Sequence, residues 1–77
     1  MRLWLRFRVR KHLREYLDRR ISLSQFRDWF DLETWDIIDK VPSATQELAG
    51  EIELRLAEFT SGHLTEDELR TLFSSLL

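Results

Sequence analysis

The sequence contains the segment YLDRRISLSQFRDWF at residues 16–30 and a related segment, FTSGHLTEDELRTLF, at residues 59–73. Aligned without gaps, the two segments share few identical residues, but their chemistry matches wherever a helix would start. We interpret them as an internal repeat. One structural unit is therefore expected to occur twice in this chain of 77 residues.

Each segment carries the signals of a helix N-terminus. Ser22 and Thr65 are the expected N-caps, because a hydroxyl oxygen can accept a hydrogen bond from a free backbone N–H of the first turn. Gln25 and Glu68 follow three residues later. At that spacing a side chain reaches back to the N–H of the N-cap and closes a capping box. Both segments therefore predict a helix that starts directly after the cap.

The end of a preceding helix is expected just before each start. Gly62 suits the position after a helix end, because glycine adopts the left-handed backbone conformation without steric cost from a Cβ atom. Arg19 occupies the matching position in the first segment and is expected to cost some stability there. Each segment thus predicts a helix end, a tight turn and a helix start, which together form a helix–turn–helix hairpin.

Apolar residues at helical spacing extend the two hairpins to four helices. The expected helices cover about 6–18, about 23–31, a range that begins at a capping box of Ser43 and Gln46, and about 66–76. The expected buried stripes are Val9, Leu13, Tyr16 and Leu17; Phe26, Trp29 and Phe30; Leu48, Ile52, Leu56 and Phe59; and Leu69, Leu72, Phe73, Leu76 and Leu77. A kink at 31–33 and a short turn before Pro42 are also expected.

These elements predict the fold class. We expect an all-α protein, a compact four-helix bundle made of two helix–turn–helix hairpins. A chain of this length forms one domain, so residues 1–77 are expected to be a single helical domain. In residues 1–8 apolar side chains begin to alternate with arginines, and this pattern is not that of an amphipathic helix. For this segment a helix and a loose basic arm stay open as alternatives.

The charge is distributed unevenly along the chain, although the net charge is only −2. Residues 1–20 carry eight basic and two acidic side chains, whereas residues 21–77 carry four basic and twelve acidic ones. The simplest interpretation is that the two parts neutralise each other across helix faces. The alternative is that one part attracts a partner of opposite charge.

The composition argues against an enzyme. The absence of cysteine excludes thiol catalysis, disulfides and cysteine-based zinc sites, and makes the cytoplasm the expected compartment. There is no glycine-rich phosphate loop, and neither His12 nor His63 is accompanied by an arrangement that would activate a nucleophile. No apolar run approaches the roughly 18–20 residues that span a bilayer. We therefore expect no catalytic residue, no metal, no cofactor and no membrane span.

The acidic part of the chain supplies the candidate binding site. Trp35 lies among acidic residues, and an aromatic anchor rimmed by acids is typical of an interface aimed at a basic partner. The candidate partner-binding residues are Asp28, Asp31, Glu33, Trp35, Asp36 and Asp39. We therefore expect another protein, of basic character, as the partner. Leu54 is a second candidate contact, because it interrupts the polar side of the third helix.

Two other functions stay open. One is a small adaptor or homodimeric accessory subunit, in which exposed aromatic side chains pair with a second copy or another protein. The other is nucleic-acid binding through the basic N-terminal arm, where arginines alternate with aromatic side chains. It is the less favoured of the two, because Asp28 and Asp31 in the second helix would repel a phosphate backbone.

Residues 16–26, which read YLDRRISLSQF, resemble the early helix–turn–helix of the colicin-D-type immunity proteins. These proteins are small bacterial helical bundles that bind and block a cognate toxic nuclease. The resemblance implies a non-enzymatic, antitoxin-like inhibitor whose acidic surface covers a basic RNA-binding active site. It assigns no individual binding residue.

Overall fold

The computed structural model describes residues 3–34 and 43–77 of the chain. Four α-helices, and no strand, occur in these two ranges. They are α1 (Leu3–Leu17), α2 (Leu23–Thr34), α3 (Ser43–Thr60) and α4 (Glu66–Ser74). The prediction of an all-α four-helix fold is confirmed.

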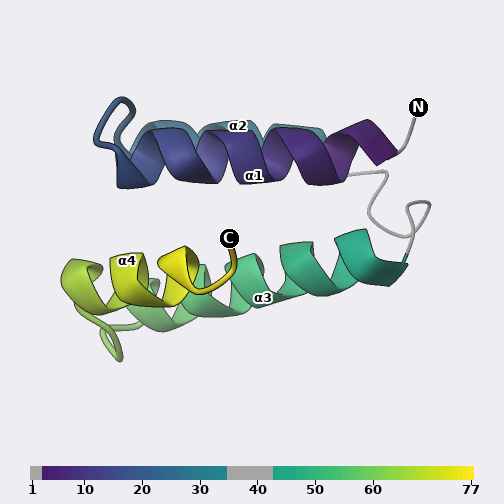
Figure 1. Cartoon of the computed structure of the whole chain (residues 1–77). Coiled ribbons are helices and arrows are strands. Elements are labelled where there is room, and N and C mark those ends of the chain that lie inside the picture. Colours follow the sequence, from purple (N-terminus) through teal and green to yellow (C-terminus); the bar gives the residue numbers. More distant parts are fainter. Residues whose placement is uncertain (1–2, 35–42) are drawn as a thin grey trace.

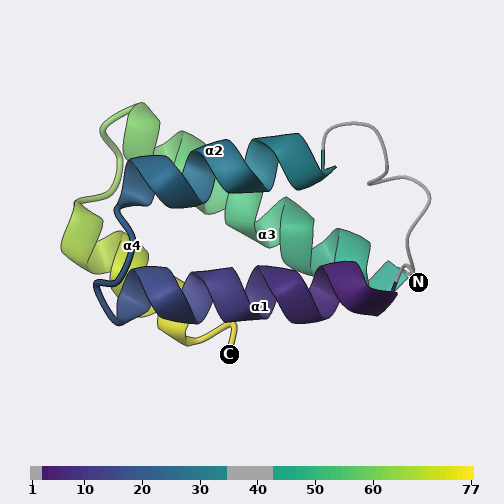
Figure 2. The ribbon, with the colours of Figure 1, turned by 90° about the horizontal axis from the view of Figure 1, so that it is seen from above.

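The helices form two layers (Figure 1). One layer is the α1–α2 hairpin and the other is the α3–α4 hairpin, so each segment of the repeat forms the turn of one layer. Seen from above, α1 and α2 lie side by side and α3 runs obliquely beneath them (Figure 2). Helix α1 packs against all of the other three helices and is the element that joins the two layers.

The two hairpin turns have the same backbone geometry. Arg19 has a φ of +63° and Gly62 a φ of +86°, so both residues adopt the left-handed conformation. The hydrogen bonds also match the pattern of a Schellman motif. In each turn a backbone N–H bonds a carbonyl five residues earlier at 2.8 Å, from Arg20 to Glu15 and from His63 to Glu58. The repeat is therefore structural as well as chemical.

The two capping boxes predicted within the repeat form. The N–H of Gln25 donates to the Ser22 hydroxyl at 3.0 Å, and the Ser22 N–H donates to the Gln25 side chain at 2.8 Å. The corresponding distances between Thr65 and Glu68 are 3.2 and 2.9 Å. Each box satisfies two N–H groups that the first helical turn leaves without a backbone partner.

The core lies between the two layers. Its fully or nearly fully buried apolar residues are Leu5, Val9, Leu13 and Tyr16 from α1, Phe26 and Phe30 from α2, Ala49, Ile52 and Leu56 from α3, and Leu69 and Phe73 from α4. Phe26 is central, because its ring centroid lies 5.8–6.3 Å from those of Phe30, Phe73, Tyr16 and Trp29. Aromatic pairs at such distances add about 0.5–1.5 kcal/mol beyond burial.

The predicted stripes face this core, with differences in detail. Seven residues of the predicted stripes are only partly buried, namely Leu17, Trp29, Leu48, Phe59, Leu72, Leu76 and Leu77. Thr45 and Ala49, which were not in the predicted stripe of α3, are buried. Both side chains are small, and the prediction left them out because it considered only large apolar residues.

Several helix boundaries differ from the prediction. Helix α1 begins at Leu3, so residues 3–8 are helical. The kink expected at 31–33 is wrong, because α2 continues to Thr34, a buried residue whose hydroxyl donates to the Phe30 carbonyl at 2.7 Å. Ser43, the predicted N-cap, is the first residue of α3.

The C-terminal boundary also differs. Helix α4 ends at Ser74, two residues earlier than the predicted 76. The turn predicted before Pro42 lies outside the described residues.

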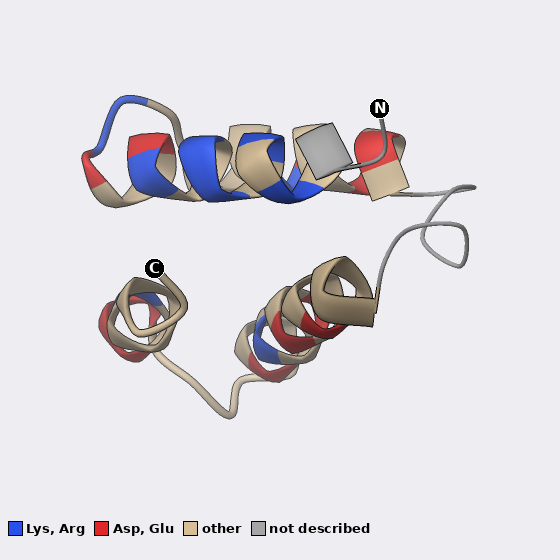
Figure 3. Cartoon of the chain, turned by 45° about the vertical axis from the view of Figure 1, so that its right-hand side comes forward, with Lys and Arg blue, Asp and Glu red and all other residues tan. Residues whose placement is uncertain are grey.

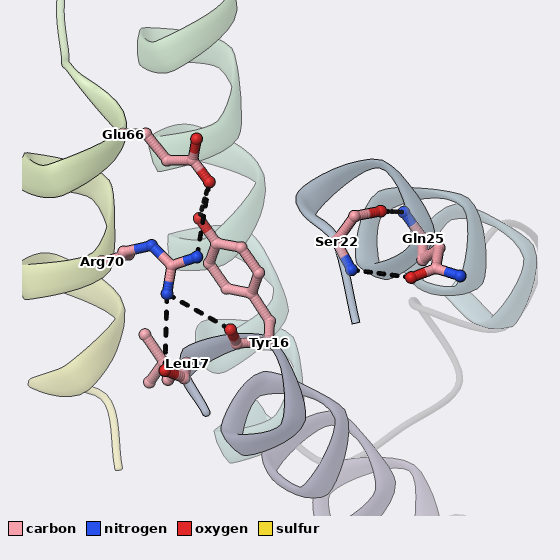
Figure 4. A network of polar contacts seen from close by, with 6 residues as sticks. All are labelled: Tyr16, Leu17, Ser22, Gln25, Glu66 and Arg70. Carbon is pink, nitrogen blue, oxygen red and sulfur yellow. Dashed lines mark hydrogen bonds and ion pairs between the residues drawn. The ribbon is translucent and has the colours of Figure 1, made fainter. Parts of the chain in front are cut away.

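A polar network links the layers at the hairpin end of α1 (Figure 4). The Tyr16 hydroxyl donates to the Glu66 carboxylate at 2.8 Å. The Arg70 guanidinium lies 4.4 Å from the centre of the Tyr16 ring and donates to the carbonyls of Tyr16 and Leu17 at 3.4 and 3.5 Å. Arg70 thereby binds carbonyls at the C-terminus of α1, where a cation interacts favourably with the helix dipole.

Two contacts join α1 to α2. The His12 ring stacks on Trp29 with the ring centroids 3.7 Å apart. The Arg8 guanidinium forms an ion pair with Glu33 at 2.6 Å. With the buried stripes, these contacts fix which side of α1 faces α2 and which faces solvent.

Candidate binding surfaces

The outer side of α2 presents an exposed leucine between acids. Phe26, Phe30 and Thr34 point into the core, and helical geometry places residues 28 and 32 on the opposite side. Leu32 is 81% exposed, the highest value among the large apolar side chains that the structure describes. Asp28 and Asp31 are both exposed. Burial in the fold therefore does not account for a leucine at this position.

A shallow depression continues this surface onto α3. Its wall on α2 includes Arg27 and Asp31, and its wall on α3 includes Glu53, Ala57 and Thr60. The carboxylates of Asp31 and Glu53, which lie far apart in the sequence, therefore line one hollow. We call Asp28, Asp31, Leu32 and Glu53 the acidic face.

The predicted site residues do not all lie together. Asp28 and Asp31 belong to the acidic face. The Glu33 carboxylate is ion-paired with Arg8 of α1, and only 28% of its side chain is exposed. Trp35, Asp36 and Asp39 lie outside the described residues.

Leu32 and Glu53 were missed from the sequence. Leu32 could have been found, because a helical projection of 23–34 places it opposite the buried phenylalanines. Glu53 could not, because its proximity to Asp31 depends on how α3 packs against α2.

A second surface covers the outer side of α1. Leu5, Val9 and Leu13 are buried, so Phe7 and Lys11 face outward. Phe7 is 71% exposed. A groove along this side is lined by Phe7, by five basic residues and by two acids, namely Arg6, Arg10, Lys11, Arg14 and Arg20, and Glu15 and Asp18. We call Phe7 and the five basic residues the basic face.

The charge separation between helices is visible in Figure 3. Lysine and arginine gather along α1, whereas the charged residues of α3 and α4 are mostly aspartate and glutamate. On α3 part of this charge is neutralised, since Arg55 forms ion pairs with Glu51 at 2.7 Å and with Glu58 at 2.8 Å. The hydrogen bond to Glu58 is the main cause that raises the pKa of Arg55. Leu54, the second predicted contact, is 50% exposed on this helix.

Besides Arg55, Tyr16 has a clearly shifted pKa. Burial, followed by the hydrogen bond to Glu66, raises the pKa of Tyr16 above its usual value. The phenol is therefore a structural donor at neutral pH. Among residues 3–34 and 43–77 no three His, Asp or Glu side chains are grouped so that they could hold a metal ion. In the same ranges no helix has both the length and the apolarity needed to cross a membrane.

Comparisons with protein-family models, curated proteins and solved structures found no match to this chain.

Proposed function

We propose that this chain is a non-enzymatic protein-binding module that takes a basic protein on its acidic face. The observation that carries the proposal is the exposure of Leu32 beside Asp28 and Asp31 on the outer side of α2. An apolar side chain left in water contributes nothing to folding, whereas a partner that covers it would gain about 1.5–3 kcal/mol from its burial. The surrounding carboxylates give the same surface a preference for positive charge.

The shape of this surface supports a protein rather than a small ligand. The acidic face is a convex helix side joined to a shallow depression, and small molecules bind in deeper, more enclosed sites. A central apolar contact with a charged rim is the usual anatomy of a protein interface. Asp28 and Asp31 would supply the rim on α2, and Glu53 would extend it onto α3.

A finer proposal follows from the resemblance of residues 16–26 to colicin-D-type immunity proteins. A nuclease that binds RNA carries a basic active site, and an acidic protein surface can compete for it. We therefore propose inhibition of a basic nuclease as the specific activity. The alternative is an adaptor or accessory subunit, which would bind its partner without inhibiting it.

The proposal is tested by capturing the partner from the host. The tagged chain is purified after nuclease treatment, which removes proteins bridged by nucleic acid, and the recovered proteins are quantified. We expect a stoichiometric basic protein with the unmodified chain and at least a tenfold loss of it with D28K/D31K. Reversal of both charges would repel the same partner.

The matched control is E15K/D18K. It reverses two acids with the same spacing, Glu15 near the end of α1 and Asp18 directly after that helix, away from the acidic face, and should leave recovery unchanged. Circular dichroism must show the same helicity for both variants. Equal recovery with D28K/D31K and the unmodified chain would contradict the proposal.

The captured protein then separates inhibitor from adaptor. Its nuclease activity on RNA is measured while the chain is added in increasing amounts. Loss of activity at equimolar chain, with recovery of activity for D28K/D31K, is the result expected of an inhibitor. A partner without nuclease activity would support the adaptor, and a second copy of the chain as the sole partner would support a homodimer.

A further inference from the structure

The basic face of α1 lies apart from the surface used in the proposed function. It faces away from α2, because α1 turns Arg8 and His12 toward that helix. Among the described residues, the side chains of Arg6, Lys11, Arg14 and Arg20 have no ion pair and no hydrogen bond. Arg10 is held at the edge, where it donates to the Leu77 carbonyl at 3.1 Å. Four cations are therefore available to a ligand.

The exposed phenylalanine indicates what kind of ligand fits. Phe7 lies within the groove together with Arg6 and Arg10, and 71% of it is exposed. It offers a flat aromatic surface next to cationic groups. Proteins that bind single-stranded nucleic acid combine these two elements, because arginine and lysine contact the phosphates while bases stack on the aromatic ring.

We infer that the basic face binds single-stranded nucleic acid, with the phosphates on Arg6, Lys11 and Arg14 and a base stacked on Phe7. The inference does not depend on the proposed function, which uses the acidic face.

An acidic protein and an anionic membrane fit this surface less well. Among the side chains that the structure describes, Phe7 is the only apolar one that lines the groove, and one apolar residue does not make the strip that a partner helix needs. Membrane association likewise needs a broad apolar face. Arginine is also the more frequent cation here, and its planar guanidinium matches phosphate oxygens better than an ammonium does.

The groove is pre-formed. The inward side of α1 is buried, the His12 ring is stacked on Trp29, and the C-terminal end is held by Arg70. The cations are thus spaced along a rigid helix, and binding would order side chains but not the backbone. Glu15 and Asp18 line the same groove and limit the path of a phosphate chain toward Arg20.

The salt dependence of binding follows from the number of available cations. Single-stranded nucleic acid gives a slope of about −0.7 per neutralised phosphate in a plot of log K against log salt concentration. Contacts with Arg6, Lys11 and Arg14 would give a slope of about −2, which corresponds to a roughly 20-fold loss of affinity between about 50 and 200 mM salt.

The test uses the full chain and a fluorescent oligothymidylate, with binding measured by fluorescence anisotropy. We expect K11Q/R14Q to weaken binding at least tenfold and F7A to weaken it about fivefold or more, the effect of losing one stacked base. R27Q/R55Q is the matched control, because it removes the same number of charges from α2 and α3. It should change the affinity less than twofold.

Three results would overturn the inference. One is no binding of the oligothymidylate at about 50 mM salt, where electrostatic attraction is strong. Another is an equal loss of affinity for K11Q/R14Q and R27Q/R55Q, with helicity unchanged, since binding would then depend on net charge and not on a particular site. The third is tighter binding of heparin, polyglutamate or anionic vesicles than of the oligonucleotide, with no effect of F7A, which would assign the face to another class of partner.

Discussion

At the scale of single residues, Arg19 is the position where this sequence departs from its own repeat. Its φ of +63° is close to the +86° of Gly62, but only the glycine adopts this conformation without a steric cost. The first hairpin thus has, at its left-handed position, a residue that disfavours this backbone conformation. The surrounding Schellman hydrogen bonds and the packing of α1 on α2 hold it in place.

Replacing Arg19 with glycine is therefore expected to stabilise the chain. The left-handed conformation costs a non-glycine residue about 1–2 kcal/mol, partly offset by the greater entropy of an unfolded glycine. We expect R19G to raise the free energy of unfolding by about 0.5–1 kcal/mol in urea denaturation. G62A should lower it by about 1 kcal/mol, although a Cβ atom there would meet no neighbouring atom. Destabilisation by R19G would contradict this account of the turn.

Tyr16 predicts a dependence of stability on alkaline pH. Its pKa in the folded chain is raised above the value of about 10 that it has in the unfolded chain. As the pH rises through 10 the unfolded state therefore releases the phenolic proton first. The free energy of unfolding is at its full value below pH 10 and falls above it.

Because the chain has a single tyrosine, tyrosinate absorbance reports this group alone. We expect the native protein to titrate above the denatured one. Y16F should remove that part of the pH dependence and cost about 1 kcal/mol at neutral pH, through loss of the hydrogen bond to Glu66. A native titration at the ordinary tyrosine pH would contradict both the burial of the Tyr16 hydroxyl and its bond to Glu66.

At the scale of elements, local chemistry was enough to predict the helix starts at Ser22 and Thr65. A capping box involves residues three apart, and no distant contact is needed to form it. The continuation of α2 to Thr34 could not be predicted, because it depends on burial of that residue against the rest of the fold. Glu53 could not be placed beside Asp31 from the sequence, because the two residues lie on different helices, whereas Asp28 and Asp31 could be grouped because they lie on one helix.

The caps can be tested with neighbouring serines on α2. S22A removes the hydroxyl that accepts from Gln25 and should lower the free energy of unfolding by about 1 kcal/mol. S24A is the matched control, because Ser24 is exposed within the first turn and should change stability by less than about 0.5 kcal/mol. Thermal or urea unfolding followed by circular dichroism measures both. An equal change in stability for S22A and S24A would mean that the capping box does not contribute to stability.

The inward and outward sides of the helices can be compared with two leucines. L13A removes a fully buried side chain of α1 and should cost about 2–5 kcal/mol, the usual range for a buried leucine. L32A removes a side chain that is 81% exposed and should cost less than about 0.5 kcal/mol. Urea unfolding measures both. A large loss for L32A would mean that Leu32 supports the fold, and the reason for assigning it to a partner would disappear.

At the scale of the whole molecule, the two layers separate the charges that the sequence carries in its two parts. The basic residues of the first part lie mainly on the outer side of α1, while the acidic face joins α2 to α3. The expected neutralisation between the two parts occurs in the ion pair of Arg8 with Glu33, whereas Arg55 pairs with Glu51 and Glu58 of its own helix. The remaining charge is left on separate surfaces, so partners of opposite sign would not compete for one site.

The central claim, that a basic protein covers Leu32, is tested most directly by a photo-crosslinking residue placed at position 32 in the host. The account predicts an adduct with a basic protein that is lost when D28K/D31K is added and does not form from position 71, which is exposed on α4. No adduct from position 32, or one that D28K/D31K leaves unchanged, would contradict it.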